Sequence, residues 1–163
     1  MEKTNACRIL EKLKISFDVI EYPVDPEHLD ARHVADALGQ DIKGVFKTLV
    51  LQGDKNGYFV CVIQGDEEVD LKKAAKISGN KKAAMIQMKE LLPLTGYIRG
   101  GCTAIGMKKN FPVFLDQNAL SQEKIYISAG KRGMQIVLKP SDYISVTNAQ
   151  TGDLIKEEIN DHE

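Results

Sequence analysis

The residue with the clearest chemical potential is Lys47, which lies in the β-rich run Val45-Phe46-Lys47-Thr48-Leu49-Val50-Leu51. Side chains alternate along a strand, so Lys47 shares a face with apolar residues, and the opposite face is mainly apolar too. An ammonium there must extend along its stem to water, find a partner, or line a cavity. A partly buried lysine also loses basicity, which suits proton transfer or stabilisation of an oxyanion.

A second candidate is the glycine pair Gly100-Gly101, within the glycine-rich segment of residues 95–106. Adjacent glycines let backbone N–H groups approach a ligand closely and point at a negative oxygen. A tight turn or bulge between strands is the alternative explanation, and it is the commoner one for an isolated pair. The glycine spacing of a P-loop or a dinucleotide-binding loop is absent.

Cysteine and histidine are sparse: the chain has Cys7, Cys61, Cys102, His28, His33 and His162. Three widely spaced cysteines argue against a disulfide framework, and no histidine stands at metal-ligand spacing. Cys102 follows the glycine pair, but no histidine lies in a recognisable relation to it, so a small core residue is the commoner role. The sequence therefore predicts neither a metal nor a cofactor.

Composition places the chain among ordinary globular proteins, with 163 residues, 43% hydrophobic and 28% charged. No run approaches the ~20 apolar residues of a membrane span, and the N-terminus resembles no signal peptide, so we expect a cytoplasmic protein. The net charge of −1 gives no global basic field, so any contact with nucleic acid must be local and brief. The basic residues available for it are Lys72, Lys73, Lys76, Lys81, Lys82, Lys108, Lys109, Lys131 and Arg132.

The elements that must position these residues follow from periodicity and from capping residues. Helices are predicted at residues 4–14, around 34–38, at 71–78 and at 89–92. Strands are predicted at residues 17–22, 45–51, 58–63, 83–86, 113–115, 124–128 and 134–138. Strands and helices mix without strict alternation, which predicts one α+β domain over residues 1–163, with a tail that frays after about residue 148.

Several of these segments occur in the order seen in the YbaK family, which the chain resembles from about its first helix to Asp142. They are Phe46-Lys47-Thr48-Leu49, Val69-Asp70-Leu71-Lys72-Lys73, Thr95-Gly96-Tyr97, Gly100-Gly101 through Gly106-Met107-Lys108-Lys109, and Ser128-Ala129-Gly130-Lys131-Arg132-Gly133. Members of that family are Cys-tRNA(Pro) deacylases, related to the editing insertion of bacterial prolyl-tRNA synthetases.

The resemblance implies a compact α+β fold with a mixed, barrel-like sheet flanked by helices. It implies that Lys47 is essential, that Gly100 shapes the pocket for the aminoacyl ester with Gly101 beside it, and that further residues bind the substrate. Those are Tyr22, Thr48, Ser128 and Gln135. Three departures bear on substrate preference: Thr103-Ala104 stands for Ser-Pro, Gln135 for an aspartate, and Asp30 lies near the place of an expected aromatic residue.

Hydrolysis of Cys-tRNA(Pro) is a reasonable task physically, because cysteine is close enough to proline in size that a synthetase pocket cannot exclude it by volume. The chemistry proposed for the family uses the substrate's own thiol to attack its ester, so the protein supplies positioning and a site for the oxyanion. The alternatives are hydrolysis of Ala-tRNA(Pro) by water, and a non-catalytic module that holds aminoacyl-tRNA or the synthetase. The expected partners are aminoacyl-tRNA and prolyl-tRNA synthetase, with no membrane.

Overall fold

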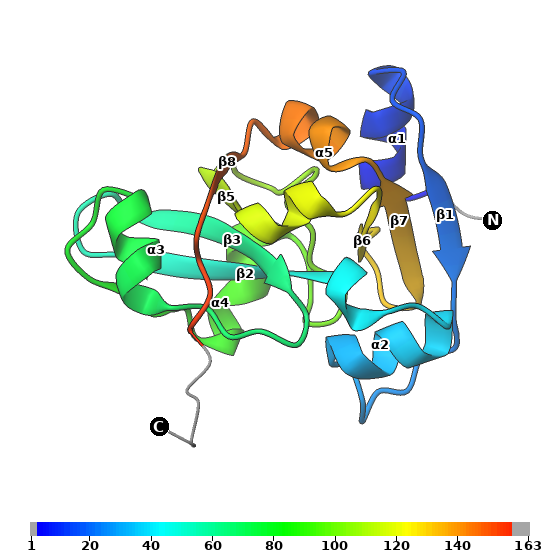
Figure 1. Cartoon of the computed structure of the whole chain (residues 1–163), viewed down its shortest axis with the longest axis horizontal. Helices are drawn as coiled ribbons and strands as arrows, with labels where there is room; N and C mark the ends of the chain where they lie inside the picture. The colour runs from blue at the N-terminus through cyan, green and yellow to red at the C-terminus, as the bar shows by residue number, and fades with distance from the viewer. Residues whose placement is uncertain (1–2, 158–163) are drawn as a thin grey trace.

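Two β-sheets form the frame of the protein in the computed structural model, which describes residues 3–157 (Figure 1). The smaller sheet is antiparallel and has the order β1 (Asp18–Glu21), β7 (Met134–Leu138), β6 (Ile125–Ser128). The larger sheet has the order β4 (Ala83–Met85), β2 (Phe46–Gly53), β3 (Tyr58–Gln64), β5 (Val113–Asp116), β8 (Gln150–Gly152). It is mixed, because β4, β2 and β3 pair antiparallel and β3, β5 and β8 pair parallel.

The helices pack around these sheets and begin at capping residues. They are α1 (Asn5–Lys12), α2 (Ala31–Leu38), α3 (Leu71–Ile77), α4 (Met88–Thr95) and α5 (Pro140–Thr147), with 3-10 turns η1 (Ile42–Gly44) and η2 (Gln117–Ser121). The side chains of Thr4, Asp30 and Asp70 accept hydrogen bonds from free N–H groups in the first turns of α1, α2 and α3. Gly39 ends α2 in the left-handed conformation, as its position in the sequence predicts.

Two apolar clusters cover the two faces of the larger sheet. Along β3, Val60 and Val62 belong to the first cluster, which also contains residues of α1, α5 and the smaller sheet. Phe59 and Ile63 belong to the second cluster, which is covered by α3. A strand buried on both faces has a continuous apolar sequence, and both β2 and β3 have that character.

The predicted single barrel-like sheet is not confirmed, because the described strands form two sheets and close no barrel within residues 3–157. An isolated parallel bridge between Val45 and Tyr126 joins the two sheets at one point. What the structure supports is the coarser prediction, a single compact α+β domain with mixed strand directions.

The predicted fraying after about residue 148 is wrong for residues 150–155. There β8 pairs with the exposed edge of β5, Val69 bridges Ile155, and Leu154 is fully buried in the second cluster. An open strand edge is a template for pairing, and Leu154 adds apolar burial, so a polar segment becomes ordered. The rest of the predicted tail, residues 158–163, lies outside the described residues.

Candidate active site between the two sheets

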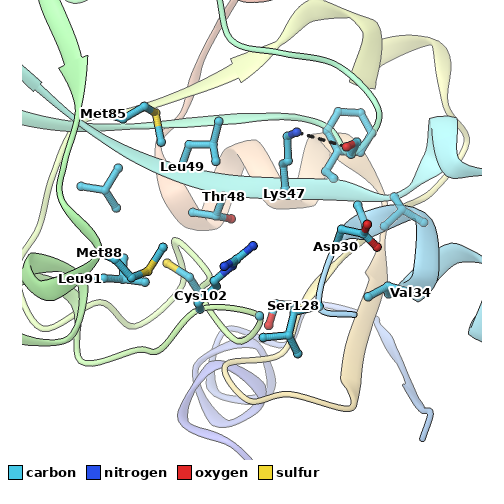
Figure 2. Close-up of a pocket in the computed structure, with 18 of the residues that line it drawn as sticks. Asp30, Val34, Lys47, Thr48, Leu49, Met85, Met88, Leu91, Cys102 and Ser128 are labelled. Carbon is cyan, nitrogen blue, oxygen red and sulfur yellow. Dashed lines mark hydrogen bonds between the residues drawn. The ribbon is translucent and has the colours of Figure 1, made fainter. Parts of the chain in front are cut away.

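A cavity of about 340 Å³, called here the main cavity, has walls from both sheets (Figure 2). Residues 45–50, in and just before β2, form one wall, and Ser128 and Gln135 from β6 and β7 form another. The remaining walls come from α2 and the residues before it, from the β4–α4 segment, and from the loop around Gly100. This volume lies within the ~300–1,000 Å³ that is usual for sites that bind small ligands.

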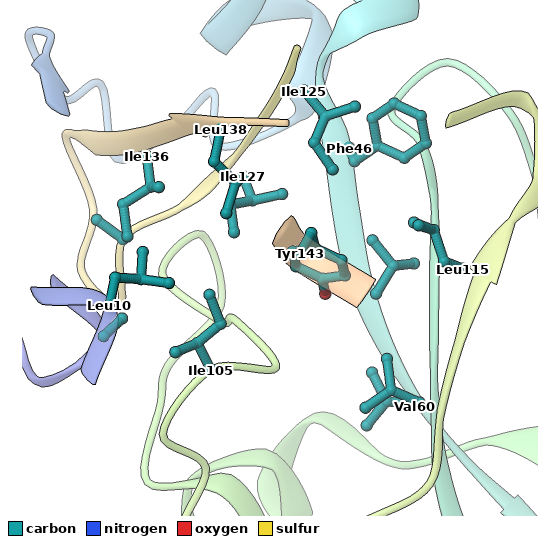
Figure 3. Close-up of a cluster of buried hydrophobic side chains, with 14 of the residues drawn as sticks. Leu10, Phe46, Val60, Ile105, Leu115, Ile125, Ile127, Ile136, Leu138 and Tyr143 are labelled. Carbon is teal, nitrogen blue, oxygen red and sulfur yellow. The ribbon is translucent and has the colours of Figure 1, made fainter. Parts of the chain in front are cut away.

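The start of β2 is fixed beside the cavity by its alternating side chains. Phe46 is 3% exposed and packs in the first cluster near Ile125 and Leu115 (Figure 3). Its neighbour Lys47 therefore projects from the opposite face of the strand, on the side of Leu49 (Figure 2). The backbone position of Lys47 is thus held by core packing on the other side of the sheet.

The Lys47 side chain is half-buried, and its Nζ donates a hydrogen bond of 3.1 Å to the Gly65 carbonyl oxygen. Burial lowers the pKa of this ammonium from 10.5, and the nearby carboxylates of residues 66–68 oppose that shift. A lysine has three N–H donors, so two remain for a ligand after the bond to Gly65. Among the possibilities that the sequence left open, Lys47 lines a cavity and has a backbone carbonyl as its partner.

Thr48 adds an open strand edge to the main cavity. The Val45 carbonyl accepts a bond from Gly65 on the β3 side, whereas the Val50 carbonyl accepts one from Ile86 on the other side. Backbone groups alternate in direction along an antiparallel pair, so the N–H and C=O of Thr48 point away from β3, as those of Val50 do. β4 pairs only with the last three residues of β2, and the bridge to β6 lies at Val45, so no strand pairing among the described residues reaches Thr48 on this side.

Gly100 and Gly101 have different roles in the structure. Gly100 lines the main cavity with a φ of +86°, and its N–H has no hydrogen-bond partner among the described residues. The Gly101 N–H donates to the Ile98 carbonyl at 2.9 Å, so it is not available for the predicted oxyanion site. A Cβ on Gly101 would lie 2.9 Å from the Cα of Lys131, so this glycine lets the loop pack against the turn of residues 130–133.

Ser128 and Gln135 are cross-strand partners, and both line the main cavity. The Ser128 hydroxyl accepts a 3.3 Å bond from the Gly130 N–H. Gln135 is 4% exposed, and its Oε1 is buried without a partner among the described residues. An unsatisfied buried amide costs about 1–3 kcal/mol, so a polar side chain without a partner in a cavity wall indicates a place for a ligand.

Tyr22 does not line the main cavity. Its N–H donates to the Gly133 carbonyl at 2.9 Å, which holds it at the end of β1, against a smaller cavity of about 120 Å³. We call this space the second cavity. The structure therefore brings Lys47, Thr48, Gly100, Ser128 and Gln135 together in the lining of the main cavity. Gly101 lies outside that lining, and Tyr22 lines the second cavity instead.

Several lining residues were not predicted from the sequence. One end of the main cavity is apolar and rich in sulfur, and Figure 2 shows Leu49, Met85, Met88, Leu91 and Cys102 gathered there. Met85 and Met88 come from β4 and α4, and no sequence pattern shows that this segment packs beside β2. Asp30 and Arg99 also line the cavity, and only Asp30 had a local signal, as the capping residue of α2.

Cys102 is not poised as a nucleophile. Burial raises the pKa of its thiol to about 12, so the thiolate is scarce at neutral pH. No histidine lines the main cavity, since His28 and His33 face the second cavity.

Within residues 3–157, no three side chains of His, Cys, Asp and Glu come together as a set of metal ligands. No helix in the same range has the length and apolar content needed to span a bilayer.

Comparisons with known proteins identify the family of the chain. Residues 25–146 match the model of the aminoacyl-tRNA editing domain. EbsC of Enterococcus faecalis, whose name gives it as a candidate Cys-tRNA(Pro)/Cys-tRNA(Cys) deacylase, is 48% identical over 157 residues, 96% of each chain. A proline–tRNA ligase of Shouchella clausii is 28% identical over 119 residues, 73% of this chain and 21% of the ligase.

A solved structure leads to the same family. The crystal structure of a candidate trans-editing enzyme for prolyl-tRNA synthetase superposes with a TM-score of 0.81 and 25% identity, covering 96% of this chain and 100% of that one. The family match spans most of the chain, and the relative from Enterococcus faecalis matches nearly all of it. This protein belongs to the aminoacyl-tRNA editing domain family.

Proposed function

We propose that this protein is a deacylase that hydrolyses the ester of mischarged Cys-tRNA(Pro), acting in trans in the cytoplasm on errors of prolyl-tRNA synthetase. Its family, and the name of its 48% identical relative, support the reaction class. The observation that carries the proposal is the content of the main cavity. It combines a tethered ammonium, an open strand edge and a sulfur-rich end, without a protein nucleophile that contacts a base.

The hydroxyl and thiol side chains of the lining are those of Thr48, Cys102 and Ser128. Lys47 also lines the cavity, and as an ammonium it has no lone pair with which to attack an ester. Neither Thr48 nor Ser128 bonds to a histidine or a carboxylate among the described residues, and the thiol of Cys102 has a raised pKa. A serine, threonine or cysteine nucleophile needs such a base or a positive field to react at neutral pH. The nucleophile is therefore assigned to the substrate's thiol.

In the proposed reaction, the cysteinyl sulfur attacks the ester carbonyl carbon and the carbonyl oxygen becomes negative. Collapse of this intermediate breaks the bond to the ribose oxygen, which receives the proton that the thiol has lost, and a four-membered thiolactone forms. Water then opens the thiolactone and releases cysteine. The two free N–H donors of Lys47 and the N–H of Gly100 are the groups assigned to the oxyanion.

The geometry of the substrate explains why the protein can catalyse this reaction by positioning the thiol against the ester. A well-oriented intramolecular attack reaches effective molarities of ~10⁵ M or more, although the strained four-membered ring falls below that value. The open backbone N–H and C=O of Thr48 are suited to hold the α-amino and ester groups in line. The end of the cavity formed by Met85, Met88 and Cys102 is soft and polarizable, which suits a small thiol side chain.

The test is a set of deacylation assays on one tRNA(Pro) charged in turn with cysteine, serine, alanine or proline, using wild type and Cys102→Ala. We expect rapid loss of cysteine, slow loss of serine and retention of proline, with Cys102→Ala keeping most of the wild-type activity. Equal cleavage of seryl and cysteinyl esters would overturn substrate-thiol assistance. Preferential cleavage of the alanyl ester would show that the protein hydrolyses Ala-tRNA(Pro) with water as the nucleophile. No cleavage of any ester would show that the protein is a non-catalytic binding module.

A further inference from the structure

The second cavity adjoins the main cavity directly, because Leu29, Val34 and Gly100 line both. At about 120 Å³ it is smaller than the ~300–1,000 Å³ of sites that hold a whole ligand. A space of that size next to a larger one is suited to one part of a ligand whose other part fills the larger cavity. Gly100 itself adds no side chain to the shared wall, and a Cβ there would lie 3.4 Å from the side chains of Leu29 and Arg132.

The walls of the second cavity carry flat rings. The imidazoles of His28 and His33 are stacked, with centroids 4.3 Å apart and ring planes 29° from parallel. Each ring is held through Nδ1 by a carboxylate, His28 by Asp25 at 2.7 Å and His33 by Asp30. Tyr22 lines the same cavity. Fixed aromatic faces of this kind stack with nucleobases, at a loss of about 1–3 kcal/mol per base when the ring is removed.

A cation without an acidic partner completes the second cavity. The Nε of Arg132 donates to the Arg99 carbonyl at 2.8 Å, which fixes the guanidinium beside Gly100. Among the described residues, Arg132 forms no ion pair with a carboxylate, whereas Lys73, Lys124 and Lys156 each form one. An oriented guanidinium with free N–H groups is a good donor set for a phosphate.

We propose that the second cavity binds the 3′-terminal adenosine of the tRNA, with the base against Tyr22 and the imidazole pair and the 5′-phosphate on Arg132. This inference rests on the proposed function, because it assumes an amino acid in the main cavity. An aminoacyl ester is attached to the terminal ribose, so the ribose must lie at the wall shared by the two cavities. The base and the 5′-phosphate of that nucleotide then have the second cavity and its rim as the nearest space.

The proposal is tested with free nucleotides, without any ester chemistry. AMP, adenosine and inorganic phosphate are titrated separately into the protein, and the imidazole proton signals of His28 and His33 are followed by NMR. The chain has only three histidines, so substitution assigns these signals. The variants are Tyr22→Leu, which removes a ring, and Arg132→Gln, which removes a charge. Lys124→Gln is the matched control, because Lys124 is ion-paired with Asp18 and lines neither cavity.

We expect AMP to shift both imidazole signals in a saturable way. Arg132→Gln should weaken AMP binding about tenfold, the factor of one charge-assisted hydrogen bond, and leave adenosine binding unchanged. Tyr22→Leu should weaken AMP and adenosine equally, and Lys124→Gln should change neither. If AMP leaves both imidazole signals in place, or if inorganic phosphate alone reproduces its effect, the proposal is wrong.

Failure of this inference can be separated from failure of the proposed function. A protein that deacylates Cys-tRNA(Pro) without any AMP-dependent shift at His28 and His33 retains its function and places the adenosine elsewhere. A protein that binds AMP with the predicted pattern of variants but cleaves no aminoacyl-tRNA keeps the nucleotide site and loses the proposed reaction. In the deacylation assay, Arg132→Gln is expected to raise KM about tenfold with little change in kcat, because it affects binding away from the ester.

Discussion

Replacing Lys47 with methionine removes the ammonium from the main cavity and keeps most of the side-chain volume. Loss of one preorganised oxyanion donor lowers kcat by about 10²–10³. The folded protein also loses the bond from Nζ to the Gly65 carbonyl, at a cost of about 1 kcal/mol. Relief of the burial that lowers the pKa of Lys47 opposes this loss, so the free energy of unfolding should change by at most about 1 kcal/mol.

A change of that size shifts Tm by about 2–4 °C in a chain of this length, so activity and folding are measured independently. The assay is single-turnover deacylation of Cys-tRNA(Pro), with a thermal melt of the same preparation. Lys43→Met is the control, because Lys43 is exposed on the preceding 3-10 turn and does not line the cavity. A folded Lys47→Met protein with wild-type kcat would refute the assignment of the oxyanion site.

Four further predictions concern core packing, salt dependence and pH dependence. Gly101→Ala places a Cβ 2.9 Å from the Cα of Lys131, so thermal melts should show a loss of about 1–3 kcal/mol; an unchanged Tm would contradict the packing role. Leu154→Ala empties a fully buried site and should cost about 2–5 kcal/mol in denaturant titrations, whereas a frayed tail would cost nothing. Deacylation at sub-saturating tRNA should fall with added salt, with a log–log slope of roughly −1 per phosphate contact, and a flat response would indicate recruitment by a protein. Burial lowers the pKa of Lys47 from 10.5, so the folded state releases this proton at a lower pH than the unfolded chain does. Wild type should therefore gain stability relative to Lys47→Met as the pH rises toward 10.5, and parallel pH curves for the two proteins would rule this out.

The sequence predicts local structure well where the signal is local. Asp70 caps α3 and Gly39 ends α2, as the sequence pattern indicates. The helix α5 was missed because its clearest signal is Pro140 at the first helical position, and its apolar anchor is the single buried ring of Tyr143. The strand β8 has no apolar period and exists because β5 offers a free edge, which is a tertiary effect.

The sequence indicated lining residues of the main cavity where the chemistry is visible in single residues. Lys47 stands out because a charge in an apolar strand requires a partner or a function, and Gly100 stands out as part of a glycine pair. The family resemblance added Thr48, Ser128 and Gln135. The sulfur-rich end depends on how β4 and α4 pack beside β2, which no sequence period encodes. Tyr22 lines the second cavity and not the main cavity, because the hydrogen bond from its N–H to the Gly133 carbonyl, in the turn before β7, fixes its position.

The bridge between Val45 and Tyr126 has a consequence for the dynamics of the protein. The main cavity is lined by residues of both sheets, and this bridge joins those sheets only two residues before Lys47. A substrate that contacts Thr48 on one side and Ser128 on the other acts as a reversible cross-link between two separately hydrogen-bonded sheets. Amide hydrogens of both sheets should therefore exchange more slowly, and in concert, when the main cavity is filled.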